Sequence, residues 1–150
     1  KKPLGTAGSL ALIEDETIDR LIVMNGDVLT GCDFESLIGF HEKLRADATI
    51  CVKYYEIKNP YGAVKLDNFN LLGFEEKPVV KYQINAGIYV LEKQVRKLVP
   101  KMCKIDMPEL LLKSQKENLS VCGFPLFENW NDIGNPKELA EMQKSLSDND

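Results

Sequence analysis

The feature that most constrains the fold is a short apolar run, Leu21 to Met24, which ends abruptly in Asn25-Gly26-Asp27. Consecutive apolar residues closed by turn-forming residues are typical of a strand that is buried on both faces. Asp27 then lies just beyond the carboxyl end of that strand. Open α/β sheets bind their ligands at this rim, so the run predicts both a fold class and the location of a site.

A strand, a helix and a second strand follow one another over residues 21–52. Apolar residues recur at helical spacing over residues 34–45, behind Asp33, which is a good N-cap. Residues 48–52 form another apolar run and are predicted as a strand. This order predicts a parallel pair of strands joined by a right-handed crossover, the unit of doubly wound α/β sheets.

The rest of the chain alternates strands and helices. A hairpin is predicted over residues 62–76, because Asp67 to Asn70 favour a turn between two strands. Further strands are predicted at residues 84–91 and 119–124, and helices from Ser9, at residues 95–99 before Pro100, behind the capping box of Asp106 and Glu109, and behind Asn135. Residues 1–150 are therefore predicted to form one domain, a mixed α/β sheet with a hairpin excursion.

Length and charge exclude several classes of function. With 150 residues, 44% of them hydrophobic, the chain is long enough for one core and too short for two. The net charge of −4 argues against a nucleic-acid partner, because binding to a phosphate backbone needs a basic surface. No apolar run approaches the roughly 18 residues that span a bilayer, so no membrane partner is expected. Four cysteines without a C-x-x-C pair fit a reduced, cytoplasmic protein.

Two aspartates are the candidate metal ligands. Asp27 follows the first strand, and Asp132 is predicted in a loop between a strand and the helix behind Asn135. Two carboxylates from separate loops suit Mg²⁺, a hard ion that takes few protein oxygens and leaves positions for water and phosphate. Taken by itself, Asn25-Gly26-Asp27 fits a solvated turn more often than a metal site, and the pairing of the two aspartates is a hypothesis.

Other segments have a functional and a structural interpretation. Glu75 to Pro78 ends the hairpin, where a Glu can hold sugar hydroxyls and a Lys can neutralise a phosphate; the same residues also fit a solvated charge cluster. The loop Gly5 to Gly8 precedes a predicted helix and can offer backbone N–H groups to a ligand. Trp130 can stack on a ligand or belong to the core. His41 lies on the apolar helical face and is predicted to be a core residue.

The order of these motifs resembles the sugar-1-phosphate nucleotidyltransferase family, which makes nucleotide sugars and includes mannose-1-phosphate guanylyltransferases and glucose-1-phosphate thymidylyltransferases. The resemblance covers nearly the whole chain. It rests on LGTAGSL from Leu4, VMNGDVLT from Val23, DF at Asp33, PYGAVKLD from Pro60, FEEKP from Phe74, NAGIYVLE from Asn85, DMPELL from Asp106 and WNDIGNPKEL from Trp130. Among subfamilies it is most similar to the guanylyltransferase-type enzymes of bacterial surface-sugar pathways, including those of nonulosonic acids.

The resemblance implies a Rossmann-like mixed sheet of the nucleotide-diphospho-sugar transferase type, truncated at its N-terminus. It implies that Asp27 and Asp132 hold Mg²⁺ and, together with Lys77, are the catalytic residues. The residues implied to border the nucleoside base are Gly5, Thr6, Ala7 and Gly8. Those implied to line the sugar-phosphate pocket are Tyr61, Gly62, Glu76 on the hydroxyls, Lys77 on the phosphate, Asn85 and Gly87.

The implied reaction is attack of a sugar-1-phosphate oxygen on the α-phosphorus of a nucleoside triphosphate, with GTP favoured and pyrophosphate released. Such a transfer needs positioning and charge neutralisation more than proton chemistry. The family's G-x-G-T-R-L loop and the Pro-Lys pair that follows it are absent from this sequence. We therefore expect little or no catalysis by the chain alone, and an exposed sheet edge that invites association into a homo-oligomer.

Two other interpretations stay open. A non-catalytic module could bind a nucleotide sugar and regulate a partner, although it would have no need to retain both Asp27 and Asp132. A glycosyltransferase with the same kind of sheet would use the nucleotide sugar as its substrate. That second interpretation expects a D-x-D motif after a strand, which Asp27-Val28-Leu29 does not match.

Overall fold

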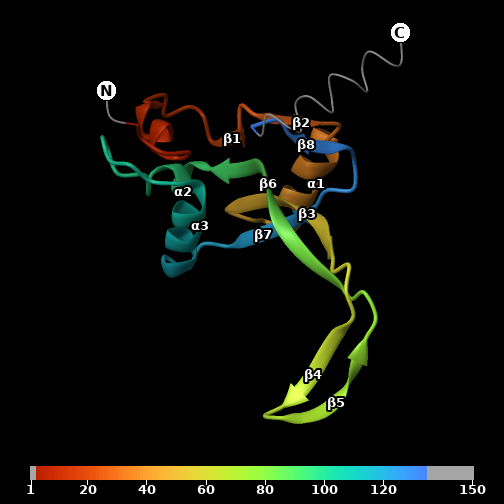
Figure 1. Ribbon diagram of the computed structural model, residues 1–150. Helices are drawn as coiled ribbons and strands as arrows, with labels where there is room; N and C mark the ends of the chain where they lie inside the picture. The colour runs from red at the N-terminus through yellow and green to blue at the C-terminus, as the bar shows by residue number, and fades with distance from the viewer. Residues whose placement is uncertain (1–2, 135–150) are drawn as a thin grey trace.

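The computed structural model describes residues 3–134, and the body of the protein is built on one four-stranded sheet (Figure 1). The strands lie in the order β1 (Arg20–Met24), β6 (Val79–Glu92), β3 (Ala48–Lys58) and β7 (Val121–Pro125). β6 is antiparallel to β1 and to β3, whereas β7 is parallel to β3. The predicted mixed α/β sheet is confirmed.

The predicted strand, helix and strand are present, but the two strands are not neighbours. Helix α1 (Phe34–Leu44) begins behind Asp33, whose Oδ1 accepts from the backbone N–H groups of Glu35 and Ser36 at 3.0 and 3.2 Å, as the predicted N-cap requires. β1 and β3 point the same way, yet β6 lies between them. The two strands are parallel, as predicted, but they do not pair with each other, because the later β6, buried along residues 86–91, takes the centre of the sheet.

β6 occupies the centre because its residues 86–91 are buried on both faces of the sheet. Alternate side chains of a strand point to opposite faces, so this one strand contributes to two cores. The first core includes Tyr89 and Leu91 with Leu110 of α3 (Met107–Lys116), and the second includes Ile88 and Val90 with Leu37 of α1. Both faces of the sheet are therefore covered, as a doubly wound arrangement demands.

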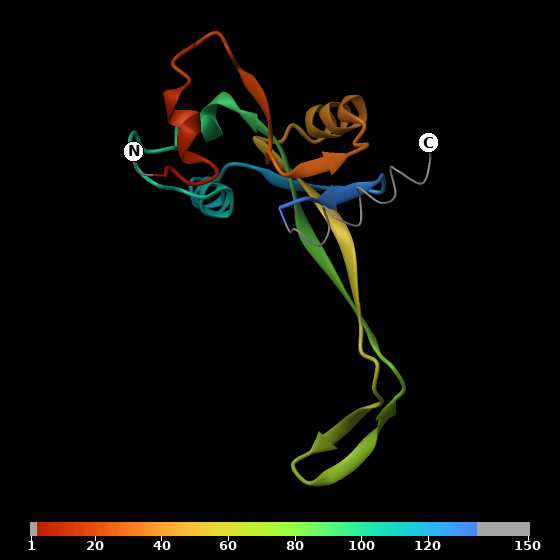
Figure 2. The same ribbon diagram turned by 45° about the horizontal axis from the view of Figure 1, so that its top comes forward.

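β3 and β6 continue past the sheet as a two-stranded ribbon with a hairpin at its far end (Figures 1 and 2). The hairpin consists of β4 (Ala63–Asp67) and β5 (Asn70–Glu75), as predicted, and turns at Asn68 with a φ of 53°. Its apolar side chains are exposed, and that of Phe69 is 100% exposed. The hairpin therefore adds little to the two cores.

The shorter elements differ more from the predictions. The helix expected from Ser9 is a 3-10 helix, η1 (Gly8–Leu12), and α2 (Lys93–Arg96) ends before Val99. α3 begins where expected, and Glu109 Oε2 accepts from the backbone N–H of Asp106 at 3.0 Å. The helix predicted behind Asn135 lies outside the described residues. Within residues 3–134 no helix is long and apolar enough to cross a membrane.

His41 connects α1 to the sheet through buried hydrogen bonds. Its side chain is 1% exposed, with Nδ1 2.8 Å from Thr49 Oγ1 of β3 and Nε2 3.1 Å from Glu92 Oε1 of β6. Arg20 Nε of β1 donates to the same Glu92 oxygen at 2.6 Å. The prediction of a core histidine is confirmed, and its polar partners explain how an imidazole is tolerated there.

Removal of a buried side chain from β6 tests the central place of this strand. Leu91→Ala should lower the free energy of unfolding by about 2 to 5 kcal/mol, because Leu91 is fully buried in the first core. Leu66→Ala, a strand leucine that is 57% exposed in the hairpin, should change it by no more than about 0.5 kcal/mol. Urea unfolding followed by circular dichroism measures both; equal losses would contradict this account of the core.

Candidate functional site

A short antiparallel pair, β2 (Val28–Thr30) and β8 (Trp130–Asp132), brings the two predicted acids together. Val28 lies opposite Asp132, and the backbone N–H of Ile133 donates to the carbonyl of Asp27 at 2.8 Å. Asp27 Oδ2 and Asp132 Oδ1 lie 2.9 and 3.1 Å from the point that a Cβ on Gly134 would occupy. Asp132 was predicted in a loop, but it is the last residue of β8, and this strand pairing sets its position.

The pair of carboxylates fits Mg²⁺ in its chemistry. Asp27 and Asp132 supply hard oxygen ligands that face one small space beside Gly134. No group of three or more His, Cys, Asp or Glu side chains able to hold an ion occurs in the part of the chain that the structure describes. An ion held here would therefore take its remaining ligands from water and phosphate, as Mg²⁺ commonly does.

An open pocket of about 400 Å³ adjoins Asp27. One wall is the end of β1 and the turn after it, with Gly26 leaving open space where a side chain would be. Thr6, from the loop before η1, also lines the pocket. The structure thus brings the Gly5 to Gly8 loop and the Asn25 to Asp27 turn to one pocket, as a common site for these two motifs requires.

Hydrogen bonds to the residues at the start of α3 fix the Gly5 to Gly8 loop in place. The backbone N–H of Thr6 donates to Asp106 Oδ1 at 2.9 Å, and that of Ala7 donates to the carbonyl of Ile105 at 3.1 Å. Gly5 has a φ of 77°, and a Cβ there would lie 2.5 Å from the Ile105 carbonyl oxygen. The expectation that this loop offers its N–H groups to a ligand is wrong for Thr6 and Ala7, because both groups already bind the protein.

An irregularity in β6 at Asn85 to Gly87 positions the turn that carries Asp27. Asn85 Nδ2 donates to Tyr89 Oη at 2.6 Å, and Asn85 Oδ1 accepts from the backbone N–H of Gly87 at 2.9 Å. Gly87 has a φ of 70°, and its carbonyl accepts from the backbone N–H of Asn25 at 2.8 Å. Burial raises the pKa of the Tyr89 phenol above its ordinary value, so it stays protonated and neutral.

The same irregularity also positions the strand that carries Asp132. Trp130 Nε1 donates to the carbonyl of Ala86 at 2.8 Å, and the indole packs against the second core. Trp130 is therefore a half-buried residue at the margin of the second core, and its indole N–H is hydrogen-bonded. Sequence reasoning missed this connection, although a glycine inside the apolar run of β6 is a known signal for a bulge or a close backbone approach.

The predicted residues of the hairpin form a second, separate group. Tyr61, Gly62, Glu76 and Lys77 lie where the ribbon meets the hairpin, at the opposite end of the molecule from β2 and β8 (Figures 1 and 2). Tyr61 is 76% exposed, and a Cβ on Gly62 would lie 3.2 Å from Glu76 Oε2. The structure does not bring this group to Asp27 and Asp132.

Two buried thiols are unsuited to nucleophilic chemistry. Cys32 and Cys51 both belong to the second core. Burial raises the pKa of the Cys51 thiol to about 12 and also raises the pKa of Cys32. Because the thiolate is the reactive form, both stay inert at neutral pH.

Comparison with known proteins gives a consistent family. A family model described as nucleotidyl transferase matches residues 1–149. The chain is 35% identical over 147 residues to the mannose-1-phosphate guanylyltransferase catalytic subunit beta of Dictyostelium discoideum, covering 91% of this chain and 40% of that protein. It is 32% identical over 154 residues to the mannose-1-phosphate guanylyltransferase of Mycobacterium tuberculosis, covering 96% and 42%. The chain thus spans about two-fifths of the length of these relatives.

Solved structures show the same fold. The crystal structure of HddC from Yersinia pseudotuberculosis complexed with GMP-PN matches with a TM-score of 0.65 and 25% identity, over 97% of this chain and 64% of that one. A putative glucose-1-phosphate thymidylyltransferase from Bacillus anthracis matches with a TM-score of 0.65 over 94% and 61%. At 20% identity, this second likeness shows the fold alone.

Substitution of Gly87 tests the irregularity in β6. Gly87→Ala should lower the free energy of unfolding by about 1 to 3 kcal/mol, because the φ of 70° disfavours any side chain and a Cβ would lie 2.8 Å from Asn25 Nδ2. Gly73→Ala in β5, where a Cβ meets nothing within 4 Å, is the control and should be near neutral. Chemical denaturation compares the two, and a Gly87→Ala protein as stable as the control would rule out this role.

Proposed function

The chain belongs to the nucleotidyl transferase family, and on that premise we propose that this protein transfers a nucleotidyl group from a nucleoside triphosphate to a sugar-1-phosphate and releases pyrophosphate. GTP and mannose-1-phosphate are the proposed substrates, since the curated relatives are named for that guanylyltransfer. The proposed setting, precursor synthesis for bacterial surface sugars, rests on motif resemblance. The observation that carries the proposal is the convergence of Asp27 and Asp132 at Gly134, beside an open pocket.

In this proposal Asp27 and Asp132 hold Mg²⁺, which when bound supplies charge neutralisation at the phosphate oxygens. The two carboxylates are supported before any ligand arrives, Asp27 by the Asn25 to Gly87 hydrogen bond and Asp132 by β8. Such preorganisation lowers the cost of orienting the reacting groups. The nucleophile in this reaction is a phosphate oxygen that is already ionised at neutral pH, so the transfer depends on positioning and charge neutralisation rather than on a general base.

The nucleoside part is proposed to lie in the pocket between Thr6 and the turn after β1. Val23 and Met24 offer apolar surface to a base, and Gly26 lets a ligand approach the backbone closely. Thr6 is fixed in place, since its Oγ1 accepts from the backbone N–H of Met107 at 2.8 Å. Contacts to the base would therefore come from the Thr6 side chain and from backbone groups of the turn.

Calorimetric titration with GDP-mannose, with and without Mg²⁺, tests the metal pair. We expect magnesium-dependent binding that becomes at least about tenfold weaker in Asp27→Asn and in Asp132→Asn, because an amide is a poorer ligand for a hard cation. Asp67→Asn, at the tip of the exposed hairpin, is the matched control and should bind like the parent chain. If the affinity for GDP-mannose depends neither on Mg²⁺ nor on the two site substitutions, the proposal has no basis.

A role for Lys77 and Glu76 in the same reaction is a further part of the proposal. It requires that the β3–β6 ribbon bend and bring the hairpin to the sugar phosphate. Such bending is physically reasonable, since the outer ribbon has two strands and exposed side chains, with Tyr54 53% and Tyr82 49% exposed. In that conformation Lys77 would neutralise the sugar phosphate and Glu76 would hold hydroxyl groups.

Ligands with and without the sugar separate the hairpin's role from that of the nucleoside pocket. Lys77→Met should weaken binding of GDP-mannose several-fold and leave binding of GMP unchanged, because GMP lacks both the sugar and the phosphate that Lys77 is proposed to neutralise. Lys81→Met is the control, because Lys81 lies on the same ribbon, is similarly exposed and pairs only with Glu56 at 2.9 Å among the described residues. If the two variants bind GDP-mannose equally well, the hairpin has no part in holding the sugar.

A further inference from the structure

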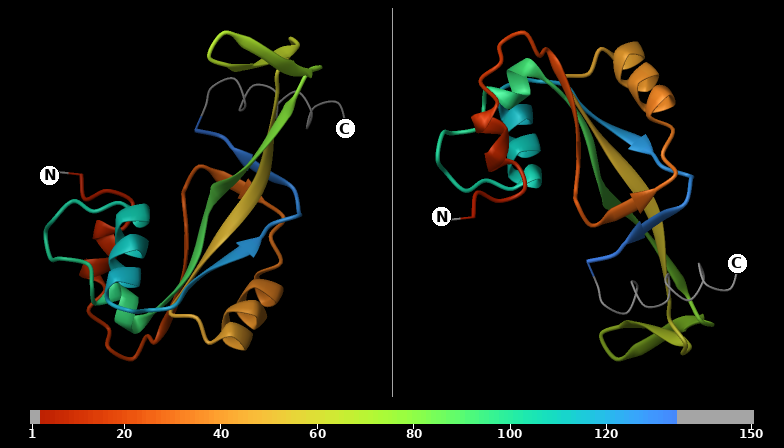
Figure 3. Two further views of the ribbon diagram at one scale, coloured as in Figure 1. Left: turned by 90° about the horizontal axis from the view of Figure 1, so that it is seen from below. Right: turned by 90° about the horizontal axis from the view of Figure 1, so that it is seen from above.

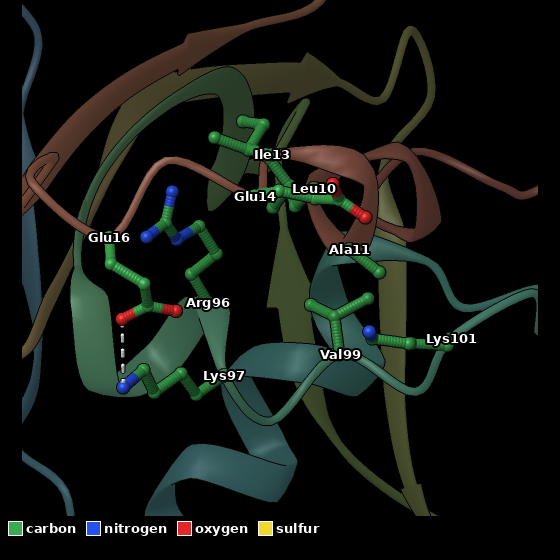
Figure 4. A pocket seen from close by; sticks show the side chains of 9 residues that line it. All are labelled: Leu10, Ala11, Ile13, Glu14, Glu16, Arg96, Lys97, Val99 and Lys101. Carbon is green, nitrogen blue, oxygen red and sulfur yellow. Dashed lines mark ion pairs between the residues drawn. The ribbon is translucent and has the colours of Figure 1, made fainter.

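A second pocket, of about 290 Å³, lies between η1, the segment that follows it and α2 (Figure 4). It shares no lining residue with the pocket beside Asp27. Figure 3 shows η1, α2 and α3 on one face of the sheet and α1 on the other, where β2 and β8 also pack. Nothing in the proposed reaction uses this pocket. Its lining combines apolar side chains with three basic and two acidic ones: Leu10, Ala11, Ile13 and Val99, then Arg96, Lys97 and Lys101, then Glu14 and Glu16.

Arg96 is the unusual member of the lining. Its side chain is 5% exposed, and its Nη2 donates to the carbonyl oxygens of Asp15 and Ile18 at 3.1 and 3.3 Å. Its Nη1 is buried without a hydrogen-bond partner in the described part of the chain. Among residues 3–134 it forms no ion pair either, and Asp15 Oδ1 instead accepts from Thr17.

A guanidinium group keeps its charge at any physiological pH, and burying an unpaired charge is strongly unfavourable. Buried arginines are therefore normally matched by a carboxylate or a bound anion. Arg96 has two carbonyl partners, and no carboxylate lies within ion-pair distance of it among the described residues. An anion in the pocket would provide a direct charge partner and an acceptor for Nη1.

The rim of the pocket supplies further positive charge. Glu16, which is 66% exposed, lies 3.0 Å from Lys93 Nζ and 3.2 Å from Lys97 Nζ, and Figure 4 shows its carboxylate on the Lys97 side. Exposed ion pairs of this kind are weak, so a stronger anion can displace Glu16 from Lys93 and Lys97. Lys101 is exposed and forms no ion pair among residues 3–134, so it can join in binding.

We propose that this pocket is a binding site for a phosphate monoester. Its phosphate group binds Arg96 and Lys97 with Lys101 at the rim, and its organic part packs on Leu10, Ile13 and Val99. The planar fork of an arginine matches phosphate oxygens with two parallel hydrogen bonds, which favours this class of anion. The site is independent of the reaction proposed above, because it uses none of the residues assigned to that reaction.

Occupation of the pocket bears on the segment that leads into β1. Arg96 already holds the carbonyl oxygens of Asp15 and Ile18, two residues just before β1 begins at Arg20. β1 in turn ends at the Asn25 to Asp27 turn. A phosphate on Arg96 would therefore order the segment that connects the two pockets.

The test is an NMR titration of the 150-residue chain carrying Asp27→Asn, which weakens the first site, with inorganic phosphate and with phenyl phosphate as probes. We expect saturable shifts at Leu10, Ile13 and Val99, with phenyl phosphate binding more tightly than inorganic phosphate. Arg96→Met should weaken binding about 10- to 100-fold, the effect of losing a charge-assisted hydrogen bond.

Lys101→Met should weaken binding about threefold, as expected for an exposed charge, whereas Lys104→Met, an exposed lysine outside the lining, should not. The comparison of Lys101→Met with Lys104→Met tests the proposed site even if Arg96→Met fails to fold. The proposal is overturned if neither probe gives saturable shifts, if the shifts appear only at Thr6 and Gly26, or if Lys101→Met and Lys104→Met bind alike.

Discussion

The candidate site depends on one irregularity in the central strand, at Asn85 to Gly87. Two successive carbonyl groups of β6 there bind the segments that carry the acids: that of Ala86 accepts from the Trp130 indole, and that of Gly87 accepts from the backbone N–H of Asn25. One bond positions the strand that ends at Asp132, and the other positions the turn that contains Asp27. The left-handed backbone of Gly87 makes this possible, since a side chain there would collide with Asn25. A single strand therefore carries both hydrophobic cores and aligns both acids.

Local signals in the sequence correctly predicted the elements whose ends are set by capping or turn residues close by. Asp33 marks α1, Asp106 with Glu109 marks α3, and Asn68 marks the hairpin turn, because capping and turn chemistry act within a few residues. Pairings between strands that are distant in the sequence have no comparable local signal. Nothing near β1 or β3 indicates that β6 inserts between them, and a strand of three residues such as β8 is too short to show a period. Asp27 and Asp132 were proposed from the motifs, but the contacts that align them were not.

Polar groups inside the protein are placed where two or more elements meet. His41 connects α1 to β3 and β6, and Asp106 connects the loop at Thr6 to the start of α3. Each is hydrogen-bonded, so burial costs little and the geometry becomes specific. Arg96 departs from this pattern because its buried Nη1 has no hydrogen-bond partner within the described residues. The fully hydrogen-bonded groups hold the fold together, whereas the unpartnered atom of Arg96 is the reason for proposing a ligand site there.

The pairing of β2 with β8 has a consequence for the order in which the protein assembles. The strands that position the two acids come from opposite ends of the described chain, so their contact closes a very long loop and is entropically costly until the sheet between them exists. A nascent chain leaving the ribosome would expose Asp27 long before Asp132 emerges. The acid pair would then be complete only once the rest of the domain has folded, and cation binding would report the last step of folding.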